Sequence, residues 1–131
     1  MNRRTLTGAV IAVVAGSAIF LVTRGPDQEV STGGSEDYSV RIVRDGPSAD
    51  PWTVEVADRA GKPVTVDQVT LDPSMPQMGH ATEPVTATLE EPGRYRAEGV
   101  QLPMPGQWEI TVRLRRGATH EEIVVPVQVT K

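Results

Sequence analysis

The sequence predicts an all-β domain, a seven-stranded antiparallel immunoglobulin-like β-sandwich, after an N-terminal transmembrane helix. Two observations predict the sandwich. After residue 37, apolar and polar residues alternate with a period of two, as they do in strands with one buried face. Turn-forming stretches interrupt this alternation at regular intervals, and no stretch after residue 25 has a helical period. A third observation, a long uncharged stretch near the N-terminus, predicts the helix.

Residues 1–24 are typical of a transmembrane signal anchor. Arg3 and Arg4 precede residues 5–23, which carry no charge. As a helix this stretch spans about 28 Å, close to the thickness of the bilayer hydrocarbon core. It is longer than the apolar part of a cleaved signal peptide and lacks a cleavage site of small residues, so we expect it to stay attached. The two arginines predict a cytoplasmic N-terminus, which puts the following domain on the periplasmic or extracellular side of the cell membrane.

Residues 25–37, GPDQEVSTGGSED, are polar and rich in glycine, and they predict a flexible linker. We expect the folded domain to cover residues 38–131. The linker then enters beside the start of the strand at Tyr38.

Seven stretches carry the strand pattern. Val69 and Leu71 fall out of phase with Val66, which predicts a bulge in that strand. Pro126 cannot donate a backbone hydrogen bond, so it predicts an edge or a bulge in the last strand. Trp52 and Trp108 each begin an alternating series and are expected in the core. The expected strands are 38–44, one from Trp52 through Val56, 64–71, 85–91, 94–99, 108–116 and 123–129.

Strand directions predict which loops meet. Consecutive strands of a sandwich run up and down one axis, so the loops 72–84 and 100–107 fall at the same end, together with the loop 45–51. The turn at Arg116–Gly117 and nearby His120 fall at the opposite end. The linker enters at that opposite end too, so the end with the two loops is expected to face away from the membrane.

All three internal methionines lie in these two loops. Met75 and Met78 are in the stretch MPQMGH, which ends at His80, and Met104 is in LPMPGQW. Thioether sulfur is a soft ligand that selects Cu(I), and imidazole also binds copper. The sequence therefore predicts a Cu(I) site formed by Met75, Met78, His80 and Met104, with the flanking prolines stiffening both loops.

Two other interpretations of the methionines stay open. Methionine side chains fill irregular gaps, so they could plug the core where the strands splay, with His80 capping a turn. Alternatively, the Met/Pro tip could be an apolar surface of a non-enzymatic interaction module that docks a partner in a membrane complex. Replacing the methionines with leucine separates metal binding from docking, because leucine keeps the apolar volume and removes the sulfur.

Composition excludes several classes of function. The formal charge of the 131-residue chain is −4, which argues against a nucleic-acid partner. The chain has no cysteine, so it has no disulfide, thiolate metal site or cysteine nucleophile. Ser74 and Asp72 lie near His80 in sequence, but such neighbours are common by chance and do not predict a hydrolase. We expect no enzymatic activity.

Three motifs resemble those of a known family. The stretch MPQMGH, the turn Pro92–Tyr95 and the stretch Met104–Trp108 are similar to the MPxMxH, PGxY and MPGxW motifs of the YtkA-like domain, also found in FixH-type proteins. The resemblance covers about residues 38–128. It implies an immunoglobulin-like sandwich on a membrane anchor and a link to copper, because FixH-type proteins are associated with the maturation of haem-copper oxidases. The partner it implies is a copper-receiving or copper-exporting membrane protein.

Overall fold

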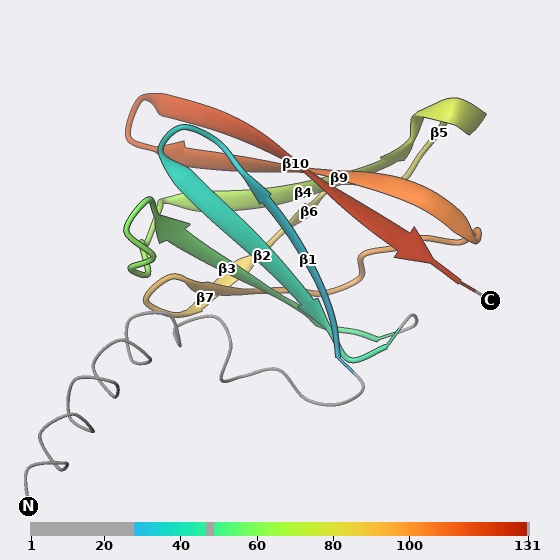
Figure 1. Ribbon diagram of the computed structural model, residues 1–131, viewed down its shortest axis with the longest axis horizontal. Helices are drawn as coiled ribbons and strands as arrows, with labels where there is room; N and C mark the ends of the chain where they lie inside the picture. The colour runs from blue at the N-terminus through green and yellow to red at the C-terminus, as the bar shows by residue number, and fades with distance from the viewer. Residues whose placement is uncertain (1–27, 47–48, 131) are drawn as a thin grey trace, which may run out of the picture.

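The computed structural model describes residues 28–46 and 49–130 (Figure 1). The expected anchor at residues 1–24 lies outside this part of the chain. Within the described residues, no helix is both long and apolar enough to cross a membrane.

Ten strands in the described residues form two antiparallel sheets. The first sheet has the order β1-β2-β3-β8-β7, and the second has the order β10-β9-β4-β5 with β6 also paired to β4. This confirms the all-β antiparallel prediction, but the expected number of seven strands was wrong. The strands are β1 (Glu29–Gly34), β2 (Tyr38–Arg44), β3 (Trp52–Asp58), β4 (Gln68–Met75), β5 (His80–Ala81), β6 (Val85–Thr86), β7 (Thr88–Glu91), β8 (Arg94–Ala97), β9 (Gly106–Arg116) and β10 (Thr119–Val129).

A single core lies between the two sheets. Trp52 and Trp108 are both buried in it, as expected. Alternate residues of β9 and β10 are buried, because each strand presents one face to the core and the other to solvent. Figure 1 shows the two sheets crossing over one another, with β1 beside β10.

The predicted linker 25–37 was wrong over residues 29–34. These residues form β1, and every one of them pairs with β2. The sequence of β1 is polar and carries little strand signal. Two contacts hold it instead: Glu29 forms an ion pair with Arg44, and the backbone at Gly33 lies so close to β10 that an added Cβ would be 2.8 Å from the Val124 carbonyl oxygen. The register pairs Glu29 with Arg44, so the chain enters the fold at the end where the 45–51 loop lies. The expected entry at the opposite end was therefore wrong.

Two irregularities mark places where the chain passes from one sheet to the other. Between β3 and β4, Pro63 bridges to Ala57 in the first sheet, and the Asp67 N–H donates to the Arg115 carbonyl in the second. The expected bulged strand 64–71 was therefore wrong: β4 begins at Gln68, and the phase shift near Val66 marks the passage between the sheets. The expected strand 85–91 divides at Ala87: β6 pairs with β4 in the second sheet, and β7 pairs with β8 in the first.

Candidate metal centre

The stretch MPQMGH forms a tight hairpin between β4 and β5. Residues Pro76–Met78 make one turn of 3₁₀ helix, η1, and Gly79 follows in the left-handed conformation with φ 67° and its N–H donating to the Pro76 carbonyl at 3.1 Å. Proline suits the first position because its φ is fixed, and glycine suits the last because positive φ strains other residues. The spacing of Pro76 and Gly79 therefore builds the turn.

This turn pairs Met75 directly with His80. Opposed residues of an antiparallel pair point to the same side of the sheet, with Cβ atoms about 5 Å apart. One thioether and the imidazole are thus placed side by side by the backbone itself. His80 is exposed, and among the described residues its side chain makes no hydrogen bond.

Met75 is a core residue rather than a loop residue. It is the last residue of β4, and its side chain is 2% exposed. The strand continues through Pro73, which the sequence had placed in a loop. Gly106 leaves room for the thioether, since an added Cβ there would lie 3.0 Å from the Met75 Cε and 4.0 Å from its Sδ. The expectation that methionine plugs the end of the core holds for this residue.

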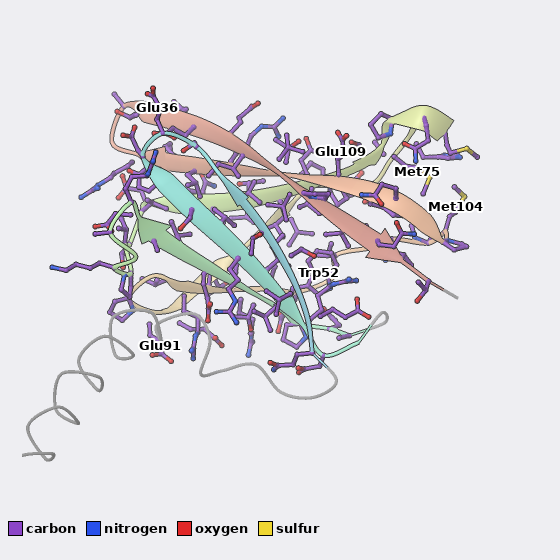
Figure 2. All side chains as sticks on the ribbon, in the orientation of Figure 1. Glu36, Trp52, Met75, Glu91, Met104 and Glu109 are labelled. Carbon is purple, nitrogen blue, oxygen red and sulfur yellow. The ribbon has the colours of Figure 1, made fainter. Side chains whose placement is uncertain are left out.

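The loop that carries Met104 lies against the hairpin. The Trp108 Nε1–H donates to the Met104 carbonyl at 2.9 Å, and Gln77 Nε2 donates to the Gln107 carbonyl at 3.1 Å. Thr82 Oγ1 donates to the Gln101 carbonyl at 2.9 Å. The half-buried Met104 packs against the core. Figure 2 shows Met75 and Met104 at the same end of the molecule, which confirms that the two loops meet.

We call this end the methionine pole and define it by Met75, Met78, His80 and Met104. Met78 is 58% exposed on η1. His120 pairs with Arg115 beside the Gly117 turn, away from the pole, as expected. In the described chain, no three Asp, Glu or His side chains gather as metal ligands. The soft donors available at this pole are therefore thioethers, joined by one imidazole.

A pocket beside the pole was missed in the sequence. It measures about 380 Å³, is lined by the segments 49–52 and 99–103, and includes the Asp50 carboxylate. Asp50 Oδ1 accepts a hydrogen bond from the Gly99 N–H at 2.9 Å, which ties the 45–51 loop to the Met104 loop. The sequence Asp50-Pro51 could have indicated a turn at this place, because both residue types favour turns.

The interior near this end holds a buried arginine. Arg44 is 2% exposed, and its guanidinium carbon lies 5.4 Å from the centroid of the Trp52 ring. Burial lowers the pKa of Arg44, and the ion pair with Glu29 partly offsets that shift. Because Arg44 is inside the fold, it adds no accessible cation that would oppose metal binding.

The PGxY motif has a different place and role. Gly93 packs so closely on Pro63 that an added Cβ would be 2.7 Å from the Pro63 Cβ. The Tyr95 hydroxyl donates to the Val66 carbonyl and accepts from the Val66 N–H, both at 2.7 Å. Burial raises the pKa of Tyr95, while the backbone hydrogen bond to Val66 opposes the shift. These contacts fix the sheet crossover.

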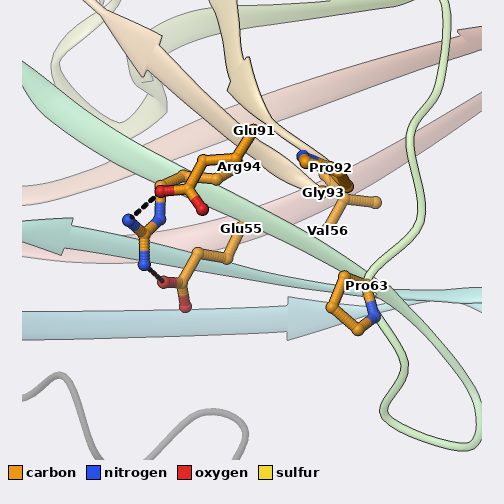
Figure 3. A pocket seen from close by; sticks show the side chains of 7 residues that line it. All are labelled: Glu55, Val56, Pro63, Glu91, Pro92, Gly93 and Arg94. Carbon is orange, nitrogen blue, oxygen red and sulfur yellow. Dashed lines mark hydrogen bonds and ion pairs between the residues drawn. The ribbon is translucent and has the colours of Figure 1, made fainter.

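A cavity of about 150 Å³ lies beside this turn (Figure 3). Arg94 sits between two carboxylates there: its Nη1 is 2.8 Å from Glu91 Oε2, and its Nη2 is 3.8 Å from Glu55 Oε2. Glu55 Oε1 also lies 3.7 Å from Arg41 Nη1, so both carboxylates form ion pairs with arginines of the fold.

Comparison with known proteins identifies a family for this chain but no individual relative. No curated protein sequence and no solved structure matches the chain significantly. The YtkA-like family model matches residues 32–113, from within β1 to within β9, and so spans all three motifs. The chain therefore belongs to the YtkA-like family.

Proposed function

We propose that the protein is a membrane-anchored, extracytoplasmic domain that binds Cu(I) through Met75, Met78, His80 and Met104 for copper handling or oxidase assembly. The observation that carries the proposal is the hairpin register, which sets Met75 directly opposite His80. The Met104 loop is hydrogen-bonded to the same hairpin and supplies further sulfur. Three thioethers and an imidazole make a donor set that suits Cu(I) better than hard cations.

The donors differ in access, and this difference fits a site that exchanges its metal. His80 and Met78 are exposed and can meet an arriving ion, whereas Met75 lies at the end of the core. Completing the site needs the Met75 thioether to turn outward from its place beside Gly106. Methionine has flexible side-chain torsions that allow this movement, and Cu(I) binding has to offset the packing that the side chain loses in the core.

A Cu(I) titration of the full-length chain in detergent, against a competing Cu(I) chelator under reducing conditions, tests the proposal. We expect one equivalent of Cu(I) to be withheld from the chelator. His80→Ala should weaken binding, and His120→Ala is the matched control because it removes the histidine at the other end. Equal affinity of these two variants, or no competition by the wild type, would refute the copper proposal.

The second candidate is a docking module, which the exposed Met78 and the adjoining pocket favour. The variant Met75→Leu/Met78→Leu/Met104→Leu keeps the apolar volume of the pole. Copper retention should fall in this variant, while association with a membrane partner should survive. Loss of copper binding with unchanged complex formation in membrane extracts would assign docking to the apolar surface rather than to the metal.

The same proposal includes an immunoglobulin-like sandwich fold and a position at the membrane. Two antiparallel sheets around one core, closed by the Tyr95 hydrogen bonds to Val66, support an immunoglobulin-like sandwich. The uncharged residues 5–23 support the anchor. The chain should stay with membranes after alkaline extraction. A protease added from the outer side of the membrane should cut it. Release into the soluble fraction would contradict the anchor.

A further inference from the structure

The three thioethers of the methionine pole are graded in solvent access. Met78 is 58% exposed on η1, a turn that buries none of its residues. Met104 is half-buried, and its carbonyl accepts the hydrogen bond from Trp108. Met75 is 2% exposed. A reagent arriving from solvent therefore meets the Met78 sulfur first.

We propose that Met78 is an oxidation site, at which a peroxide converts the thioether to the sulfoxide, and that this change weakens the Cu(I) site. The sulfur lone pair attacks one peroxide oxygen, the O–O bond breaks, and water leaves after proton transfer when the oxidant is hydrogen peroxide. Sulfur is oxidised by two electrons and the peroxide is reduced by two. The second half of this inference rests on the proposed function.

The structure explains why the fold tolerates this modification at Met78 and not at Met75. A sulfoxide is polar, so on the exposed turn it stays in water and displaces no packed neighbour. At Met75 the added oxygen would place a polar atom in the core beside Gly106, which costs free energy. Oxidation at Met78 thus removes one soft ligand while the hairpin pairing of Met75 with His80 remains.

Peptide mapping after limited treatment of the full-length chain with hydrogen peroxide tests the first half. Fragment spectra that separate Met75 from Met78 should show oxygen added at Met78 first, then at Met104, and last at Met75. In denaturant the three should oxidise at similar rates, which controls for local sequence. Oxidation of Met75 as fast as Met78 in the folded chain would overturn the assignment.

Copper titration of the oxidised chain tests the second half. Wild type carrying only Met78 sulfoxide should bind Cu(I) about tenfold more weakly or worse, because loss of a direct ligand should exceed the usual effect of a supporting residue. Met78→Leu should show the same affinity before and after the same treatment. Unchanged affinity of the oxidised wild type would overturn the regulatory half. Absence of Cu(I) binding before oxidation would instead refute the proposed function, leaving the oxidation order intact.

Discussion

The molecule has two turns that each combine a proline with a left-handed glycine, and their surroundings are opposite. In the hairpin, Gly79 has φ 67°, and an added Cβ would meet nothing within 4 Å. In the PGxY turn, Gly93 has φ 75°, and its added Cβ would collide with Pro63. The first turn is open and carries an exposed thioether, whereas the second is packed and fixes the crossover. The difference shows that one family motif serves folding, while another leaves Met78 and His80 exposed to solvent.

Gly93→Ala should have the largest effect on stability. It combines the strain of positive φ with close contacts to Pro63 and to the Val56 carbonyl, so we expect a loss of about 3–4 kcal/mol in the free energy of unfolding. Gly79→Ala is the matched control and should lose only about 1 kcal/mol. Urea denaturation measures both; equal losses would mean that the two turns do not differ in packing.

Met75→Ala should come next. Removing this core side chain leaves a cavity at the end of β4, and a loss of about 3 kcal/mol is expected. Met78→Ala removes an exposed side chain and should change stability by less than about 0.5 kcal/mol. Thermal unfolding of the two variants checks the contrast. Similar melting temperatures would show that Met75 is not held in the core.

Tyr95→Phe should cost about 2 kcal/mol, because it leaves the Val66 N–H and carbonyl buried without a partner. The loss should depend on pH. The folded state raises the pKa of Tyr95, so its stabilising contribution is full below the unfolded pKa of about 10 and declines as pH rises through and above it. Urea midpoints of wild type and variant should therefore converge at alkaline pH. A constant difference between the two urea midpoints up to that pH would show that ionisation of Tyr95 is not coupled to folding.

His80→Ala should have the smallest effect on stability, within about 0.5 kcal/mol, because the exposed imidazole has no hydrogen-bond partner among the described residues. On the proposed function, the same variant should bind Cu(I) more weakly. A large loss of stability without metal would indicate that His80 supports the hairpin instead.

The strand pattern predicted more of the fold than of the site. Alternation located the strands, and their directions brought the Met104 loop to the hairpin. The strand β1 escaped prediction because its stability comes from the Glu29–Arg44 ion pair and from contact with β10, neither of which appears in local sequence. The burial of Met75 was only one of the interpretations left open. Its place inside a strand was not predicted, because Pro73 suggested a loop, yet Pro73 pairs with Ile110 inside the sheet. The cross-strand pairing of Met75 with His80 depends on the turn geometry, which spacing alone did not give.

Because β1 runs antiparallel to β2, it determines at which end of the domain the described chain begins. Glu29 lies opposite Arg44, so β1 begins on the side of the 45–51 loop, which the Asp50–Gly99 hydrogen bond joins to the Met104 loop. On the proposed function, a membrane anchor joined at this end would hold the methionine pole toward the lipid surface. Cu(I) released from the pole would then have only a short distance to travel to an integral membrane acceptor.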